Sequence, residues 1–193
     1  MEKTQILRFW FGDPDDLKGE YGQQRQVWFK KDKAFDDEIR RLFLEDVERA
    51  AAGELVAWRE EPRSCLALLL LLDQFPRNLF RGDARSFATD RAALDVANHG
   101  ITQCFDQQVI PVERIFFYLP LEHSENLADQ ERCVELVRSL AASHPELKSY
   151  LDYAQRHRDV IQQFGRFPHR NEILARETTP AEADFLLQPG SRF

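Results

Sequence analysis

The chain contains an unbroken apolar run, Leu66-Ala67-Leu68-Leu69-Leu70-Leu71-Leu72. A helix built from these residues is apolar on every face, so it should be buried all round and lie at the centre of the fold. Pro62 precedes the run and suits the first turn of that helix. Phe75 stands before Pro76, and because a residue before proline avoids helical geometry, we expect the helix to end there.

Helical periodicity covers most of the remaining chain, and no stretch shows the sustained alternation of a strand. Further helices are expected over about residues 4–11, 33–52, 90–99, 111–118, from 124 or 126 to 143, and 145–164. Asp32 should cap the second of these, whereas Gly53, Gly100 and Gly165 should each stop a helix. Thr179-Pro180-Ala181-Glu182 is a capping box for a last helix. The pattern predicts an all-α protein with about eight to ten short helices, stacked as antiparallel hairpins in one domain over residues 1–193.

The composition argues against several classes of function. The chain has 193 residues, of which 43% are hydrophobic and 31% charged, as in a globular protein with a sizeable core. Its net charge of −7 disfavours an electrostatic grip on nucleic acid or on an anionic membrane. The three cysteines, Cys65, Cys104 and Cys133, are odd in number and widely spaced, which disfavours a disulfide framework and a cysteine zinc site. We expect a cytoplasmic protein without a signal peptide or membrane span.

Three proline-associated segments, here called the first, second and third corners, collect charged residues beside apolar helices. The first corner is Asp73–Asn78, the second is Glu122–Asp129 just after Pro120, and the third is Arg166–Asn171. The first and third corners share a Phe-Pro pair followed by an arginine and an asparagine. Charge placed beside an apolar helix must be paired or must serve a function. We therefore expect the three corners to form one site.

Five residues at or near the corners are candidates for general acid–base catalysis: Asp73, His123, Asp129, His157 and His169. A histidine oriented by a carboxylate can exchange protons near neutral pH. Simpler interpretations stay open. His157 lies on the inward stripe of its helix and could be a hydrogen-bonded core residue. Asp73 could form a structural ion pair, and the acids of the second corner could simply favour a helix N-terminus.

Anion binding is another chemistry that the corners could support. The candidate ligand-binding residues are Arg77, Asn78, Glu122, Glu125, Arg166, Arg170 and Asn171. Arginine suits bidentate binding of carboxylates and phosphates. A metal site built from His123, His157 or His169 with Asp73, Glu125 or Asp129 is a further alternative, but no metal is assigned, because only the reversed spacing His169-x-x-Glu172 occurs in place of a known ligand motif. No cofactor is expected, because the chain lacks a glycine-rich phosphate loop and a dinucleotide fingerprint. A purely structural polar network remains the alternative.

Longer motifs carry a resemblance to a known family. They include Phe9-Trp10-Phe11-Gly12, Leu72-Asp73-Gln74-Phe75-Pro76-Arg77-Asn78, Tyr118-Leu119-Pro120-Leu121-Glu122-His123-Ser124-Glu125 and Phe164-Gly165-Arg166-Phe167-Pro168-His169-Arg170-Asn171. With these motifs the chain resembles the bacterial domain-of-unknown-function family 924, over about residues 6–187. The resemblance implies a tetratricopeptide-like all-α fold and brings no activity, cofactor or catalytic residue with it. In one departure, Ala175 stands where the resemblance implies a glycine.

These observations predict a protein that binds a small anionic metabolite, and in one version transforms it, in a pocket built from the three corners. Whether the protein is an enzyme stays open, as does its oligomeric state. The alternative is a helical module that binds proteins or peptides, with the corners serving as structural ion-pair networks. The two hypotheses differ in whether the corner residues face a closed pocket or an open groove.

Overall fold

The computed structural model describes residues 3–16 and 19–191. Every regular element within these ranges is helical, and none of the described residues lies in a strand. The predicted all-α stack of helices is therefore confirmed, while its likeness to tetratricopeptide repeats stays a prediction. Among the same residues, no helix combines the length and the apolar character needed to cross a membrane.

The chain divides into two compact units. Unit 1 consists of Met1–Arg81 and Arg85–Pro120, and unit 2 consists of Gly82–Ala84 and Leu121–Phe193. The short turn η4 (Ala84–Ser86) contains residues of both units. Each unit has its own helices and its own buried side chains. The single domain expected over the whole chain stays a prediction.

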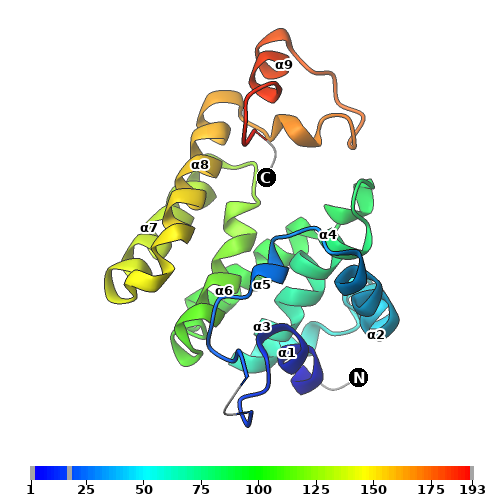
Figure 1. Ribbon diagram of the computed structural model, residues 1–193, viewed down its shortest axis with the longest axis vertical. Helices are drawn as coiled ribbons and strands as arrows, with labels where there is room; N and C mark the ends of the chain where they lie inside the picture. Colours follow the sequence, from blue (N-terminus) through cyan, green and yellow to red (C-terminus); the bar gives the residue numbers. More distant parts are fainter. Residues whose placement is uncertain (1–2, 17–18, 192–193) are drawn as a thin grey trace. The chain divides into compact units, whose positions relative to one another are not determined.

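Unit 1 contains the N-terminal helices and the long apolar run (Figure 1). Its elements are α1 (Lys3–Phe11), η1 (Gln26–Trp28), α2 (Lys33–Ala51), η2 (Val56–Glu60), α3 (Pro62–Leu69), η3 (Leu70–Gln74), α4 (Phe75–Leu79), α5 (Asp90–Thr102), η5 (Asp106–Gln108) and most of α6 (Pro111–Glu122). Helix α3 packs against α1 and α5, and α4 packs against α2. The residues from Cys65 to Leu72 are at most 3% exposed, so the apolar run is the centre of this unit.

The helix does not end at the first corner, so that prediction is wrong. It continues from α3 through the π-helical segment η3 into α4. Pro76 has no N–H for the carbonyl of Leu72 four residues earlier, and in an α-helix its ring would clash with that carbonyl. The π-helical turn changes the hydrogen-bond pattern just before the proline, with the Phe75 N–H donating to the Leu70 carbonyl. The Leu72 carbonyl instead accepts a hydrogen bond from the Thr89 hydroxyl at 2.5 Å.

Two other predicted helix ends are also wrong. Gly100 lies inside α5, which continues to Thr102. A Cβ atom at Gly100 would lie 2.7 Å from Cε1 of Phe117 and 3.2 Å from Sγ of Cys65, so glycine is needed there for close packing. Pro120 likewise lies inside α6, which continues to Glu122. The second corner therefore begins on the last turn of a helix.

Aromatic side chains pack around Trp10 in unit 1. Trp10 stacks on Trp28 with ring centroids 6.1 Å apart, and Phe116 meets both rings edge-on. The Trp28 indole N–H donates to the Trp10 carbonyl at 2.8 Å. Trp10, Phe11 and Trp28 are at most 4% exposed, so these residues belong to the core and do not offer an apolar interface.

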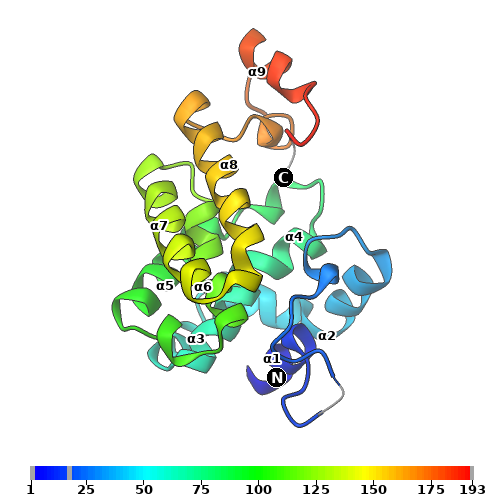
Figure 2. The ribbon, with the colours of Figure 1, turned by 60° about the vertical axis from the view of Figure 1, so that its left-hand side comes forward.

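Unit 2 is built on the antiparallel pair α7 (Leu127–Ser143) and α8 (Lys148–Phe164), which lie side by side (Figures 1 and 2). The turn η6 (Pro145–Leu147) joins them, and η7 (Pro168–Arg170) and α9 (Pro180–Leu186) follow. Asn126 caps α7, and Gly165 ends α8 in a left-handed conformation. Thr179 and Glu182 form the expected capping box of α9. The predicted caps at Asn126 and Thr179 and the predicted stop at Gly165 are therefore confirmed.

Candidate functional site

The first corner belongs to unit 1, where its charges are paired. The Arg77 guanidinium bridges Asp73 at 3.1 Å and Asp90 at 2.8 Å. Asn78 donates its Nδ2–H to Asp36 at 2.7 Å. Asp73 is 1% exposed, so it needs a partner of this kind to be charged. A structural ion pair accounts for this geometry, and the functional roles of Asp73, Arg77 and Asn78 stay predictions.

The second and third corners come together within unit 2. The backbone N–H of Phe167 donates to Oε1 of Glu125 at 2.8 Å. The Arg170 guanidinium donates to the carbonyl of His123 at 3.1 Å. A side chain of each corner thus holds the backbone of the other, which fixes the approach of two segments that are far apart in the sequence.

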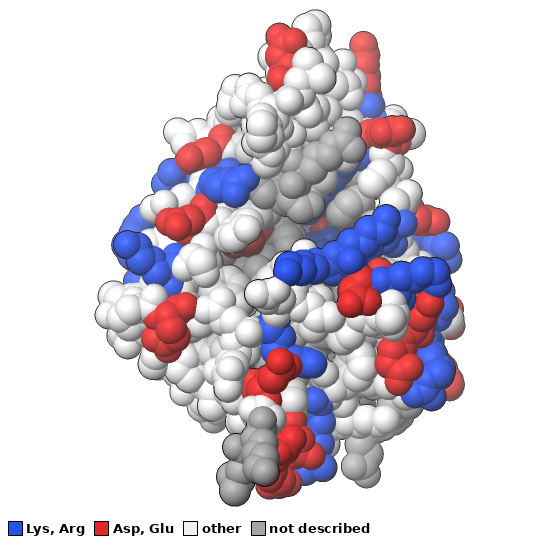
Figure 3. Space-filling model, viewed as in Figure 1, with Lys and Arg blue, Asp and Glu red and all other residues white. Residues whose placement is uncertain are grey.

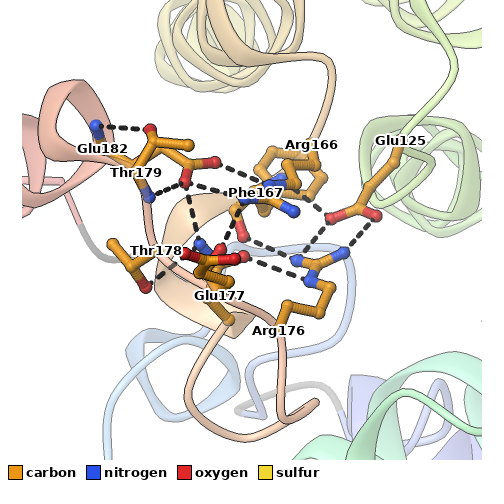
Figure 4. A network of polar contacts seen from close by, with 9 residues as sticks. Glu125, Arg166, Phe167, Arg176, Glu177, Thr178, Thr179 and Glu182 are labelled. Atoms are coloured by element: carbon orange, nitrogen blue, oxygen red, sulfur yellow. Dashed lines mark hydrogen bonds and ion pairs between the residues drawn. The ribbon is translucent and has the colours of Figure 1, made fainter.

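Five side chains, here called the outer network, link these two corners to α9: Glu125, Arg166, Asn171, Arg176 and Glu182. Figure 4 labels all of them except Asn171. Arg176 forms a bidentate pair with Glu125 at 2.7 and 3.0 Å and donates its Nε–H to Oδ1 of Asn171 at 3.1 Å. Asn171 donates to Glu182 at 3.2 Å. Arg166 pairs with both oxygens of Glu182 at 2.6 and 2.8 Å. Arginine and carboxylate alternate along this chain of contacts, so each charge in it has an opposite charge beside it.

Arginine side chains keep both carboxylates of the outer network ionised. Hydrogen bonds from Arg166 are the main reason that the pKa of Glu182 falls to about 2. Burial tends to raise the pKa of Glu125, but hydrogen bonds from Arg176 and from the Phe167 N–H outweigh it, so the pKa of Glu125 is lowered. The predicted anion-binding residue Arg166 already binds an anionic side chain, that of Glu182.

Arg176 and Glu182 are absent from the predicted site residues. Glu182 was detectable only through its capping box, and nothing local links Arg176 to Glu125, which lies 51 positions away. Ala175 has φ +51°, a left-handed conformation that favours glycine, at the position where the family resemblance implies one. The Arg176 N–H donates to the Asn171 carbonyl at 2.8 Å, which closes the turn that presents Arg176 to Glu125.

A second group, here called the histidine cluster, consists of His157, His169 and Arg170 beside the ring of Phe167, together with His123, whose carbonyl accepts a hydrogen bond from Arg170. The rings of His157 and His169 each lie 5.6 Å from the Phe167 ring. The guanidinium carbon of Arg170 lies 4.6 Å from the centre of the same ring. Phe167, His157 and Arg170 are buried, whereas His123 and His169 are partly exposed. The cluster therefore extends from the interior of unit 2 towards solvent.

His157 is neutral, and its proton lies on Nδ1. This atom is 2.9 Å from the carbonyl oxygen of Tyr153, and because a carbonyl only accepts, Nδ1 must donate. Burial lowers the pKa of His157 to about 3, and repulsion from His123, His169 and Arg170, when these are charged, acts in the same direction. The Nε2 atom consequently carries a lone pair and is a hydrogen-bond acceptor.

Glu122 lies beside His157 at the end of α6. Its Oε1 atom is 3.4 Å from Nδ1 of His157. Carbonyls at a helix end lack backbone partners, and here Gln130 donates to the carbonyls of Glu122 at 2.6 Å and Ser124 at 2.7 Å. The Ser124 hydroxyl donates to Asp129 at 2.7 Å, which places this predicted acid on the same turn. The turn that carries the second corner is thus held in one conformation by side-chain hydrogen bonds.

Two features of the charged side chains bear on possible ligands: whether they could hold a metal ion, and whether charges of one sign gather on the surface. Within residues 3–16 and 19–191, no group of three or more His, Cys, Asp and Glu side chains is arranged to hold a metal ion. Acidic and basic side chains are interspersed over the face shown in Figure 3.

The fold and these two groups define an all-helical protein with a buried histidine–glutamate pair and an arginine–carboxylate network. The chain belongs to the family described as "Bacterial protein of unknown function (DUF924)", whose sequence model matches residues 6–190. It is similar to a solved structure of a protein of unknown function from Agrobacterium tumefaciens, at 43% identity over 96% of each chain and with a TM-score of 0.83. No curated protein matches the chain. The predicted family is confirmed, and the matches name no activity or ligand.

Proposed function

We propose that this protein binds a small anionic metabolite at the histidine cluster of unit 2. One observation carries the proposal: when charged, the side chains of His123, His169 and Arg170 disfavour a proton on His157, so together they contribute a positive electrostatic potential at that position. The same potential attracts an anion.

The shape and rigidity of the cluster support the same proposal. His123 and His169 are partly exposed, so a ligand can approach them from solvent. Phe167 and Arg170, which contact each other, are the buried part of the same cluster. The backbone hydrogen bonds that join the two corners hold these side chains in place before a ligand arrives, which reduces the entropy lost on binding. If the ligand is also transformed, the neutral imidazole of His157 is the candidate general base.

A binding screen tests the proposal. Small carboxylates and phosphates are titrated into the whole protein, with isothermal calorimetry and thermal shift as readouts. Replacing His123 or His169 by alanine should weaken the best anion by roughly tenfold, since each removes one charge-assisted contact. The matched control is His144→Ala, because His144 also lies in unit 2 but pairs with Glu146. The proposal fails if no anion binds, or if His144→Ala weakens binding as much as the cluster variants do.

A second candidate function is a helical module that binds proteins or peptides. The outer network favours it, because its arginines are already paired with carboxylates and so hold the corners and α9 together. On this hypothesis His123→Ala and His169→Ala lower the free energy of unfolding, and the wild type has no anion affinity to lose. Measuring unfolding by urea and anion affinity on the same variants separates the two functions.

A further inference from the structure

The backbone of Phe167 is held by two side chains that also pair with each other (Figure 4). Its N–H donates to Oε1 of Glu125 at 2.8 Å, and its carbonyl accepts from Nη2 of Arg176 at 3.0 Å. Arg176 and Glu125 form two hydrogen bonds with each other, at 2.7 and 3.0 Å. Because Phe167 is 0% exposed, its backbone polar groups need partners within the protein. The Arg176–Glu125 pair therefore positions Phe167, whose ring lies in the histidine cluster.

Helix α9 reaches this pair through the side chain of Glu182. The Glu182 carboxylate accepts from Nδ2 of Asn171 at 3.2 Å, and Oδ1 of the same asparagine accepts from Nε of Arg176 at 3.1 Å. Arg166 binds the same carboxylate through two hydrogen bonds. Glu182 is 2% exposed, so these donors would lose a buried acceptor if α9 moved away. That loss would fall directly beside Arg176.

An apolar contact of α9 involves Phe167 as well. Phe185 packs against the buried cluster of Val160, Ile161 and Phe167, and its ring centre lies 5.1 Å from that of Phe164. Helix α9 has seven residues, and a helix of that length is not stable by itself in water. It therefore depends on its docked side chains, and both a polar and an apolar one lie close to Phe167.

We infer that α9 is a strap that opens as one unit with Phe167, and that its docking fixes the rings of the histidine cluster. Glu182 connects α9 to the backbone of Phe167 through Asn171 and Arg176. Phe185 connects α9 to the apolar cluster that contains Phe167. Proteins open locally in cooperative segments of this kind, at a lower free energy than global unfolding. This coupling involves no ligand, so it goes beyond the proposed function.

Native-state hydrogen exchange, followed by NMR on the whole protein, tests the coupling. The amide of Ala183 reports on α9, because it donates to the Thr179 carbonyl at 2.9 Å. The amide of Phe167, bonded to Glu125, reports on the other end of the coupling. Glu182→Gln and Phe185→Ala should each speed exchange at both amides by a similar factor, roughly tenfold or more. Amides inside α7 and α8 should change much less, since these helices stay closed.

Two matched controls change α9 and its end outside the docked side. Asp184→Asn removes an exposed charge from the same helix, and Leu187→Ala shortens a side chain that is 85% exposed. Neither should change exchange at Phe167. Faster exchange at Ala183 with unchanged exchange at Phe167 overturns the inference. Equal acceleration throughout α7 and α8 overturns it too, because α9 would then have no opening separate from the rest of unit 2.

The histidine rings supply a second readout. The rings of His157 and His169 each lie 5.6 Å from that of Phe167, so their carbon-bound protons sense its ring current. The NMR shifts of these protons should change in Glu182→Gln and in Phe185→Ala, and stay constant in the two controls. Shifts that stay constant in all four variants overturn the link between α9 and the histidine cluster. Neither readout uses an anion, so failure of the proposed function leaves this test unaffected.

Discussion

The hydroxyl of Thr89 lies 2.5 Å from the carbonyl oxygen of Leu72 and supplies the hydrogen bond that Pro76 cannot. Thr89 precedes α5, where a threonine usually caps the helix with its hydroxyl, but here it makes no such bond. The hydroxyl serves a different helix, and the contact joins the start of α5 to the π-helical segment.

Thr89→Val should destabilise the protein by about 1–3 kcal/mol, because it leaves the buried Leu72 carbonyl without a donor. Urea denaturation measures the change. Thr102→Val is the matched control: Thr102 also donates to a carbonyl, that of Asn98 at 2.7 Å, but it is exposed and water can replace it. The control should lie within about 0.5 kcal/mol of wild type. If both variants lost the same free energy of unfolding, the hydrogen bond to the Leu72 carbonyl would contribute no more stability than an exposed one.

Ala175→Gly should stabilise the protein. Ala175 has φ +51°, a conformation that costs an L-residue about 1–2 kcal/mol. Glycine avoids this strain, but it loses more conformational entropy on folding, which offsets part of the gain. The expected net gain is about 0.5–1 kcal/mol by urea denaturation. The same exchange at the exposed helical Ala183 should have the opposite sign and cost about 1 kcal/mol. A loss of stability in Ala175→Gly contradicts the left-handed geometry of this turn.

Glu182→Gln should destabilise the protein at neutral pH and have little effect in acid. The folded-state pKa of Glu182 is about 2, below its ordinary value of 4.5, so the carboxylate stabilises the fold above pH 4.5. That contribution is lost as the pH falls from 4.5 towards 2, because the proton then binds the folded state too. At pH 7 the loss should be about 1–3 kcal/mol, as for other hydrogen bonds to charged groups.

Denaturation of wild type and Glu182→Gln at several pH values checks this. Glu177→Gln is the control, since Glu177 is exposed and the hydrogen bond from Arg166 goes to its backbone carbonyl. A difference between wild type and Glu182→Gln that stays constant from pH 7 to about pH 2 would rule out ion pairing as the cause.

His157 should stay neutral well below the usual range of histidine. Burial lowers its pKa from 6.5 to about 3, so its NMR resonances should not shift until the pH approaches that value. In the unfolded chain the same imidazole takes up a proton near pH 6.5, so its contribution to stability is complete above pH 6.5 and falls as the pH drops towards 3. Nitrogen chemical shifts should place the proton on Nδ1. A titration near pH 6.5, or a proton on Nε2, would contradict the buried acceptor at this site.

Most helix starts and the buried helix could be predicted from the sequence. Asp32, Asn126 and the capping box at Thr179 act on backbone groups two or three residues away, so their effects are visible locally. The predicted ends at Phe75, Gly100 and Pro120 failed for a different reason. Two of them depend on residues from elsewhere in the chain, because the Thr89 hydroxyl bonds the Leu72 carbonyl before Pro76, and Phe117 packs against Gly100.

The candidate site was predictable only in part. Its histidines and arginines stand out as charged residues near proline, and two of the three corners meet in unit 2. Arg176 lies outside every corner, and its pairing with Glu125 depends on a left-handed turn at Ala175. Local sequence patterns describe neither a turn of that kind nor the tautomer of His157.

The sequence by itself determined the all-α class and the burial of the Leu66–Leu72 run, because periodicity and capping are properties of neighbouring residues. Only the tertiary structure decided that the chain passes through Pro76 as a helix, since the donor to the Leu72 carbonyl is Thr89, the residue that precedes another helix. Only the tertiary structure decided, too, which arginine pairs with which carboxylate. Such pairing depends on distances between residues that are remote in the sequence, and those distances are set when the helices pack.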